Sequence, residues 1–365
     1  MKILHTSDWH LGKTVYGRSW IMEQKHFIDN TLLPYIIEER PDVVIIAGDV
    51  FDKSIASIDA IHLFDKFIQD MDALQVPLVV VTGNHDSKDR IAIGANVLSK
   101  ENIHIVSDFR FAENPIRFCS GKTKLAVYPL PFMENVDEYE TKIRSISEKI
   151  DRNVFNILVT HGFVTRSGKN NTEFVSSVDC VKSELFKAFD YVALGHIHSY
   201  KKVESNVVYS GSPFQFFFDE SSEKKLFIEL CVKDRLYCIN TVEHSPLHNF
   251  RVIEGNFKQI INVAKREPSD DYMLICLKDS EPIYMPLVQL RVYYPNILNL
   301  TNDLLLTESL DISEDFGEKI NDEKIIMDFF REICLWNPED DDLDVVREQL
   351  KKYQTCEAMS YKNWR

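Results

Sequence analysis

Five short stretches of the chain carry side chains that can bind divalent cations or transfer protons. In chain order they are Asp8-Trp9-His10, Gly48-Asp49-Val50-Phe51-Asp52, Gly83-Asn84-His85-Asp86, His161-Gly162 and Gly195-His196-Ile197-His198. Their donor atoms are carboxylate or amide oxygens and imidazole nitrogens. This mixture suits Mn²⁺ better than an all-oxygen Mg²⁺ site or a thiolate-rich Zn²⁺ site, although donor type alone leaves zinc or iron open. The sequence therefore predicts a metal centre built from these stretches.

The five stretches share one position, because each follows a short apolar run that is typical of a buried strand. The runs are residues 2–7, 43–47, 78–81, 156–160 and 191–194. Ligands of open α/β sheets gather at the C-terminal ends of the strands, so the polar side chains should meet at one edge. Ordinary turn chemistry is the alternative, but turns would also bring Ser, Pro and Lys to these ends. We therefore expect the strand ends to form one site.

Further elements must connect and support these strands. The patterns predict helices at 20–39, 56–74 and 137–150 and additional strands at 103–107 and 124–128. The helix at 56–74 has an apolar face that should pack on the sheet. Residues 206–242 are rich in β-forming side chains, which favours a second sheet that closes a sandwich. The aromatic stretch 213–218 is predicted to be a core strand, with a wall that faces DNA as the alternative.

The motifs Asp-x-His, Gly-Asp-x-x-Asp, Gly-Asn-His-Asp, His-Gly and Gly-His-x-His occur here in one order. In this order they resemble the calcineurin-like metallophosphoesterases from residue 8 to residue 198. Within that family the chain is similar to bacterial nuclease subunits that act with a coiled-coil ATPase, through residues 6–12, 193–198, 209–213 and 290–296. The resemblance implies an α/β fold: a sandwich of two β-sheets flanked by helices, with a small α+β capping domain and a C-terminal helix-loop-helix.

The resemblance also implies a role for each site residue. Asp49 would bridge two Mn²⁺ ions, with Mg²⁺, Zn²⁺ or Fe left open as the metal. The other implied ligands are Asp8, His10 and His198 for one ion and Asn84, His161 and His196 for the other. His85, beside a ligand, is expected to be a general acid that protonates the leaving oxygen or positions the phosphate. Asp52 and Asp86 could orient such histidines by accepting a ring N–H.

We expect three parts along the chain. Residues 1–245 would form the nuclease domain, 246–304 a DNA-binding capping domain, and 305–365 a C-terminal helical segment. In the last part an apolar stripe recurs at helical spacing, formed by Ile325, Ile326, Phe329, Phe330 and Ile333. An exposed apolar helix face marks a partner site, so about 321–353 is expected to bind the ATPase. The alternative is that both helices pack on the chain's own catalytic domain.

Composition bears on DNA binding and on the cellular location. The net charge of −15 argues against strong DNA affinity, since Lys and Arg supply most of it. Residues 301–365 hold 17 Asp and Glu against 8 Lys and Arg, so the rest of the chain is much less acidic. Two bound cations would also make the site attractive to phosphate. The start of the chain and the lack of a long apolar run favour a cytoplasmic protein without a membrane partner.

The leading interpretation is a dinuclear manganese nuclease that hydrolyses phosphodiester bonds of DNA. By resemblance it would be a duplex exonuclease and a single-strand or hairpin endonuclease in DNA repair, recombination and replication. It would form a homodimer within a heterotetramer with the ATPase. One alternative is a small-molecule phosphodiesterase or phosphatase of the same fold. Another is a non-catalytic scaffold for the ATPase, although a scaffold has no reason to retain all seven metal ligands.

Overall fold

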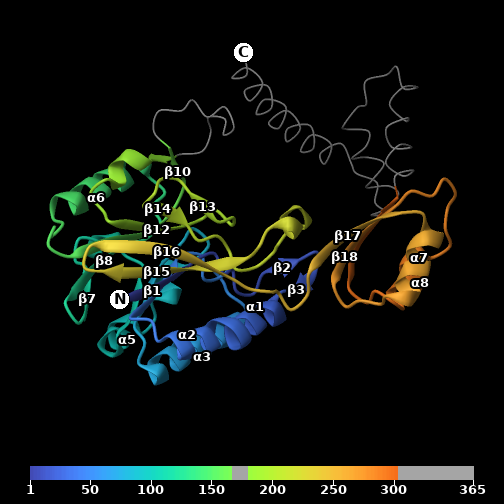
Figure 1. The fold of residues 1–365 in the computed structure, drawn as a ribbon, viewed down its shortest axis with the longest axis horizontal. Coiled ribbons are helices and arrows are strands. Elements are labelled where there is room, and N and C mark those ends of the chain that lie inside the picture. The colour runs from blue at the N-terminus through green and yellow to red at the C-terminus, as the bar shows by residue number, and fades with distance from the viewer. Residues whose placement is uncertain (167–179, 303–365) are drawn as a thin grey trace, which may run out of the picture. The chain divides into compact units, whose positions relative to one another are not determined.

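The structure is a computed structural model that describes residues 1–166 and 180–302 (Figure 1). The chain divides into two compact units. Met1–Glu254, Lys258–Ile275 and Met285–Leu300 form the first, and Gly255–Phe257, Cys276–Tyr284 and Thr301–Arg365 form the second. In the second unit the N–H of Phe257 donates to the Asp279 carboxylate at 2.6 Å, and the N–H of Lys278 to the Gly255 carbonyl at 3.1 Å.

The first unit contains two six-stranded sheets. The first sheet has the order β16 (Leu236–Glu243), β15 (Leu226–Lys233), β1 (Lys2–Thr6), β4 (Val43–Ala47), β5 (Leu78–Val81) and β6 (Ile103–Val106). Its strands β1, β4, β5 and β6 are parallel, whereas β15 runs antiparallel to both β1 and β16. The parallel strands therefore end at the same edge of the sheet, where the predicted site residues follow them.

The second sheet repeats this arrangement. Its order is β13 (Lys201–Lys202), β14 (Val207–Tyr209), β12 (Tyr191–Gly195), β9 (Phe155–His161), β8 (Thr123–Leu130) and β7 (Ile116–Ser120). The strands β14, β12, β9 and β8 are parallel, and β7 and β13 form antiparallel edges. Two short strand pairs complete the set: β2 (Thr14–Val15) with β3 (Arg18–Ser19), and β10 (Val164–Thr165) with β11 (Val181–Lys182).

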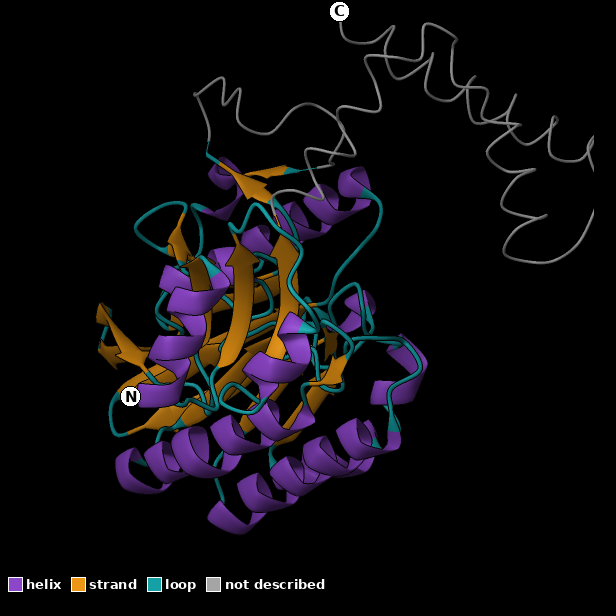
Figure 2. Ribbon diagram, turned by 90° about the vertical axis from the view of Figure 1, so that its right-hand side faces the viewer, coloured by secondary structure: helices purple, strands orange, loops and turns teal. Residues whose placement is uncertain are grey.

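Helices cover the outer face of each sheet, so the elements form four layers in the order helix, sheet, sheet, helix (Figures 1 and 2). The helices are α1 (Ile21–Phe27), α2 (Leu33–Glu39), α3 (Ile58–Leu74), α4 (Lys88–Ile91), α5 (Ala95–Leu98) and α6 (Val136–Glu148). Side chains of α1–α3 pack on the first sheet, and those of α6 pack on the second. A third apolar cluster fills the space between the sheets.

The side chains of β4 alternate between the two faces of the first sheet, and both faces are apolar, which shows why the sandwich forms. Val44 and Ile46 point into the layer under α1–α3, while Val43, Ile45 and Ala47 point into the layer between the sheets. All five residues are fully buried. A strand with two apolar faces must be covered on both sides, which fixes β4 at the centre.

The remaining described elements form a small α+β group. It consists of β17 (Phe250–Gly255), α7 (Phe257–Arg266), β18 (Tyr272–Leu277), α8 (Pro286–Arg291) and β19 (Ile297–Asn302), and the three strands form one sheet. Across the described ranges, no helix combines the length and the apolar character needed to cross a membrane.

Several details differ from the sequence-based expectations. The helix expected at 20–39 contains a π-helical turn at Ile28–Leu32, because Pro34 cannot donate an N–H and crowds the preceding turn. The strands β15 and β16 join the first sheet, and the second sheet forms without them. The stretch 213–218 is not a strand. Phe214, Phe216 and Phe218 are nevertheless buried in the core, whereas Phe217 is 51% exposed.

Candidate metal centre

The loops after β1 and β4 bring carboxylates and imidazoles together through an unusual backbone. Asp8, His10 and Asp49 have φ values of 55°, 45° and 51°, a left-handed region that non-glycine residues rarely adopt. Backbone hydrogen bonds hold these loops side by side; among them, the Asp8 N–H donates to Gly48 O and the His10 N–H to Asp49 O, each at 3.0 Å. Such strain persists only where the surrounding contacts determine it, and it is common at functional sites.

One group of donors lies at the ends of β1 and β12. Its members are Asp8, His10 and His198, whose candidate ligand atoms all lie within 4.8 Å of one another. The Nε2 atoms of His10 and His198 are 3.1 Å apart. Asp8 is fully buried and accepts the N–H of His196, at 3.0 and 3.1 Å to its two oxygens. The group therefore presents two nitrogens and a carboxylate to one point.

A second group lies at the ends of β5, β9 and β12. The Asn84 Oδ1 atom is 3.0 Å from His161 Nε2 and 3.0 Å from His196 Nδ1. The two ring nitrogens are 3.2 Å apart. These three residues thus offer one amide oxygen and two nitrogens to a second point.

Asp49 lies between the two groups. Its Oδ2 atom is 3.7 Å from His10 Nε2 in the first group and 3.3 Å from His161 Nε2 in the second. The other oxygen accepts the backbone N–H of His85 at 2.9 Å. A carboxylate oxygen placed between two sets of donors is suited to bridge two cations.

The protonation of His161 tests whether these residues fit a cation. Its Nδ1 is 2.9 Å from the carbonyl oxygen of Ala47, which can only accept, so Nδ1 carries a proton. Nε2 faces Asn84 Oδ1 and Asp49 Oδ2, which also accept, so either a proton or a cation must lie between these atoms. A divalent cation satisfies such converging lone pairs, and oxygen and imidazole donors are the ligands that Mn²⁺, Zn²⁺ and Fe²⁺ accept. The donor set therefore fits a metal.

The electrostatic setting holds most of the ligands in their metal-binding forms, but burial raises the pKa of Asp8 to about 7, so a cation would have to compete with a proton there. Burial lowers the pKa of His10 to about 2 and the pKa values of His196 and His198 to about 4, so these imidazoles are neutral. Burial raises the pKa of Asp49, but His161 outweighs it and holds that pKa below its usual range. In return Asp49 and Asp8 outweigh burial and raise the pKa of His161 to about 9, so its ring carries a second proton when no cation is bound. Neutral imidazole and ionised carboxylate are the forms that bind cations.

Glycines allow the strand ends to approach this closely. A Cβ atom on Gly83 would lie 2.1 Å from Asp49 Oδ1, and one on Gly195 would lie 1.9 Å from the Ala47 carbonyl oxygen. Gly48 has φ of 88°, and a Cβ there would lie 2.3 Å from His161 Nδ1. Any side chain at these three positions would displace the donors.

His85 lies at the edge of the first group, with its ring centroid 4.7 Å from that of His10. Its Nδ1 is 2.7 Å from the backbone carbonyl oxygen of Asp52. Because a carbonyl only accepts, Nδ1 carries a proton and Nε2 is the ring atom free to exchange one. The backbone of Asp52, not its carboxylate, therefore orients this ring.

The two carboxylates that sequence reasoning linked to histidines have different surroundings. The Asp52 carboxylate accepts from the Lys13 ammonium at 2.7 Å and is 3.7 Å from His10 Nδ1. The Asp86 carboxylate accepts the backbone N–H groups of Val50, Phe51 and Gly83 at 3.2, 2.9 and 3.0 Å. Asp86 thus joins the loops after β4 and β5 through their backbone.

Sequence reasoning missed some residues that support the site. Lys13 lies over the Phe216 ring at 5.1 Å besides pairing with Asp52. The Ser7 hydroxyl donates to the Asp8 carboxylate, and the Ser212 hydroxyl donates to the Asp8 carbonyl at 2.7 Å. Lys13 and Ser7 are next to the first motif, so their position could have marked them. Ser212 is 204 positions from Asp8, and its role follows from the fold alone.

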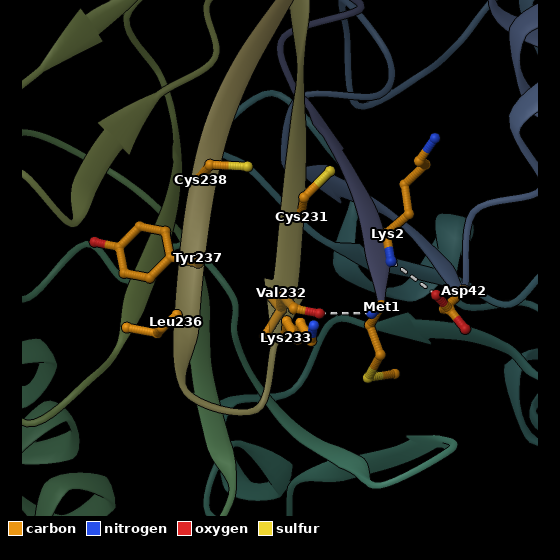
Figure 3. Close-up of a pocket in the computed structure, with 9 residues that line it drawn as sticks. All are labelled: Met1, Lys2, Asp42, Cys231, Val232, Lys233, Leu236, Tyr237 and Cys238. Carbon is orange, nitrogen blue, oxygen red and sulfur yellow. Dashed lines mark hydrogen bonds between the residues drawn. The ribbon is translucent and has the colours of Figure 1, made fainter.

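A separate cavity of about 620 Å³ lies at the opposite end of β1 (Figure 3). The Met1 amino group there donates to the Val232 carbonyl at 2.6 Å, and the Lys2 N–H to the Asp42 carboxylate at 2.7 Å. Cys231 and Cys238, which are paired residues of β15 and β16, are free thiols on its wall. None of the predicted metal ligands lines this cavity.

Comparison with known proteins adds a family and a relative. The family described as calcineurin-like phosphoesterase matches residues 1–200. The chain is 31% identical to a protein of Staphylococcus saprophyticus subsp. saprophyticus named as the SbcD subunit of the nuclease SbcCD, over 91% of this chain and 93% of that one. Among solved structures, TT1561 of Thermus thermophilus is 14% identical, with a TM-score of 0.41, over 66% of this chain and 98% of that one.

Proposed function

The chain belongs to the calcineurin-like phosphoesterase family of metal-dependent phosphodiester hydrolases, and we propose that it is a dinuclear manganese nuclease that cleaves DNA. The observation that carries this proposal is the position of Asp49 Oδ2 between two groups of donors, 3.7 Å from His10 and 3.3 Å from His161. In-line hydrolysis of a phosphodiester by two metals places the cations about 3.5–4 Å apart, and one carboxylate that binds both is suited to hold them at that separation.

DNA as the substrate is supported by the relative. That protein is named as a nuclease subunit of SbcCD, and the match extends over nearly the whole length of both chains. The match therefore includes residues beyond the phosphoesterase region at 1–200. We infer the same class of activity here: exonuclease action on duplex ends and endonuclease action on single strands and hairpins, together with an SbcC-like ATPase.

Seven side chains would hold the metals. We assign Asp8, His10, Asp49 and His198 to one ion and Asn84, Asp49, His161 and His196 to the other. When bound, the ions would neutralise phosphate charge and lower the pKa of an attacking water. The carbonyl of Ala47 fixes the tautomer of His161 through Nδ1, which directs its Nε2 lone pair to the centre.

His85 is proposed to supply the proton. Its Nδ1 proton is held by the Asp52 carbonyl, so Nε2 can donate to the leaving oxygen of the cleaved strand. The Asp49 carboxylate accepts the backbone N–H of His85, which fixes this residue relative to the centre. Asp52 is proposed to orient His10 through Nδ1, and Asp86 to hold the loops that carry Asp49 and Asn84.

The α+β group that begins near residue 246 is proposed to be the capping domain that holds DNA. Trp20 stacks on Tyr272 with ring centroids 4.6 Å apart and lies 5.6 Å from the Phe250 ring. The buried Glu23 carboxylate is 2.6 Å from His248 Nδ1 and accepts from the Tyr272 hydroxyl at 3.0 Å. These contacts connect the cap to α1 and the loop before it, next to the first donor group.

Two partner surfaces complete the proposal. About 321–353, within the helical segment 305–365, would bind the SbcC-like ATPase, and these residues lie outside the part that the structure describes. For a homodimer, contacts are proposed within the first 100 residues, where Ile58, Ile61, Ile93 and Val97 have exposed apolar side chains. Stable binding of a chain with net charge −15 to DNA would then depend on the cap, the metals and the ATPase.

The experiment that tests this function is a cleavage assay with end-labelled duplex, single-stranded and hairpin DNA in Mn²⁺, with and without the ATPase. We expect Mn²⁺-dependent cleavage of all three, and faster digestion of duplex ends when ATP and the ATPase are present. Hydrolysis of bis(p-nitrophenyl) phosphate with intact DNA would instead favour the small-molecule phosphodiesterase. No hydrolysis of either substrate would favour the scaffold.

A further inference from the structure

We infer that the cavity beside the second group of donors binds one nucleobase of a nucleotide that flanks the cleaved phosphate. This inference rests on the proposed nuclease function and specifies how its substrate is held. It predicts that the strand must release a base from its stack before the phosphate reaches the centre.

The cavity has a volume of about 340 Å³, at the lower end of the range typical of small-ligand pockets. It is lined by Asn84, Phe132, Met133, Glu134, Val136, Tyr139, His161, Gly162, Phe163, Val181 and His196. Three of these are proposed metal ligands, and most of the others are apolar or aromatic. A ligand in the cavity would therefore have one end near the metals and the remainder against an apolar wall.

The walls suit a flat aromatic ring. Phe163 lies edge-on to His196 with ring centroids 4.1 Å apart, and Phe132 lies edge-on to His161 at 6.2 Å. Both phenylalanines are half-buried, whereas Met133, Tyr139 and Val181, which also line the cavity, are buried. Stacking on such side chains accepts any base, because every base has a π face.

The position of the cavity identifies which part of the substrate enters it. A phosphate at the proposed centre is within reach of Asn84, His161 and His196, which also line the cavity. A base is attached to its phosphate through one sugar, so it is the part of the strand that can occupy the cavity. His85, the proposed proton donor, is not among the lining residues. The residues that would bind the base are therefore different from the residue that would protonate the leaving oxygen.

A base in this cavity cannot remain paired in a duplex. Unpairing costs least in single strands, hairpin loops and frayed ends, where a base is already free. This gives a physical reason for activity on those substrates, beyond the metal chemistry that all phosphodiesters share.

Binding without turnover is the first test. The full-length protein would be titrated with single-stranded DNA that carries 2-aminopurine at one position, with Ca²⁺ in place of Mn²⁺. We expect quenching of fluorescence by the native protein and little quenching by Phe163→Leu. Phe163→Tyr keeps the ring and should restore quenching, and Phe111→Leu, outside the cavity, should quench as the native protein does. Equal quenching by the native protein and Phe163→Leu would contradict the inference.

Cleavage of DNA with an abasic site is the second test. For the native protein, removal of one base next to the cut should lower kcat/KM by about 5- to 150-fold, the range that stacking of one base supplies. Phe163→Leu should show a loss of similar size on normal DNA and no further loss on the abasic strand. An abasic residue several positions away should have little effect.

The outcomes separate this inference from the function on which it rests. If the native protein cleaves normal and abasic strands at the same rate, the base cavity is wrong and the nuclease stands. If no strand is cleaved, the proposed function itself fails. Phe163 also contacts His196, a proposed metal ligand, so Mn²⁺ titration of Phe163→Leu is a necessary control. Loss of a metal in this variant would show that the Phe163 ring supports His196 and does not bind a base.

Discussion

His85 illustrates how one contact fixes the chemistry of a residue. Its Nδ1 is held by the carbonyl of Asp52, and its backbone N–H is held by Asp49, so the ring is oriented before any substrate arrives. A ring that is already in place can donate its Nε2 proton with little reorganisation. Its proposed role is therefore in the chemical step and not in holding metal.

We predict that His85→Gln lowers kcat by roughly 10²- to 10⁴-fold, the usual contribution of a general acid, with two metals still bound. Single-turnover cleavage and Mn²⁺ titration would measure the two effects separately. His62→Gln, at an exposed position on α3, is the matched control and should behave as the native protein. A variant that cleaves at the native rate would remove His85 from the mechanism, and one that loses a metal would make it a ligand.

Residue types and spacing pointed to side chains that the structure brings together, because Asp, Asn and His at five strand ends are rare by chance. They could not give the geometry that assigns roles. Asp52 acts on His85 through its carbonyl, and Asp86 accepts three backbone N–H groups. Every residue has a backbone carbonyl, so no pattern of side chains could predict the contact between His85 and the Asp52 carbonyl. Support from Ser212 depends on a long-range approach that the sequence does not encode locally.

At the scale of elements, the close approach of β4 and β12 determines the spacing of the donors. In Gly195→Ala the new Cβ would lie 1.9 Å from the Ala47 carbonyl oxygen, so the two strand ends must separate. We expect a loss of about 1–3 kcal/mol in the free energy of unfolding, as for other overpacked sites, and weaker binding of Mn²⁺. Urea unfolding and metal titration would measure both.

Gly121→Ala is the control for this prediction. A Cβ at Gly121 meets no atom within 4 Å, so the substitution adds only the strain of its left-handed φ of 60°. It should leave Mn²⁺ binding unchanged. If Gly195→Ala binds two metals as tightly as the native chain, the close approach of β4 and β12 does not set the site.

A buried carboxylate on β15 connects four elements of the first sheet and its helices. Glu229 accepts from Tyr35 of α2 at 2.6 Å and from Asn240 of β16 at 3.0 Å, and pairs with Lys2 of β1 at 3.1 Å. Burial raises its pKa, but these hydrogen bonds outweigh burial and lower the pKa to about 2. The charged form therefore stabilises the fold.

This shift predicts a pH dependence of stability. A lowered pKa contributes stability that is fully present above the unfolded value of about 4.5 and is lost as the pH falls towards about 2. Glu229→Gln should reduce the free energy of unfolding by about 1–3 kcal/mol at pH 7, and the difference should shrink below pH 4.5. Urea unfolding at pH 7, 5 and 3.5 measures it, and a difference that grows as the pH falls would contradict the assignment.

The elements that hold the site were predictable because buried parallel strands have apolar residues on both faces. The apolar sequence pattern of edge strands is weaker. The pattern predicted β structure at 206–242 but could not show that β15 pairs with β1, since that choice depends on which edge is free. The strand β17 was missed because most of its residues are exposed or only half-buried. The π-helical turn before Pro34 depends on local sterics that periodicity does not report.

At the scale of the whole molecule, the three apolar clusters of the described chain are made of residues up to Leu298. The acidic segment 305–365 lies outside the described residues, and its apolar stripe at helical spacing is the reason for the proposal that it serves a partner. We predict that a chain ending at Asn302 folds, binds Mn²⁺ and retains basal cleavage, but does not co-purify with the ATPase. Size-exclusion chromatography with the ATPase and a cleavage assay would measure this. Full co-purification of the shortened chain would show that the segment is not the docking element.

The central claim is that Asp49 bridges two metal ions at the ends of β1, β4, β5, β9 and β12. The most direct measurement is the number of Mn²⁺ ions bound per chain, by calorimetric titration or native mass spectrometry, in the native protein and in Asp49→Ala. We expect two ions in the native protein, and in Asp49→Ala loss of two-metal occupancy together with loss of cleavage. Two ions bound equally tightly by both proteins would contradict the bridging role and the mechanism built on it.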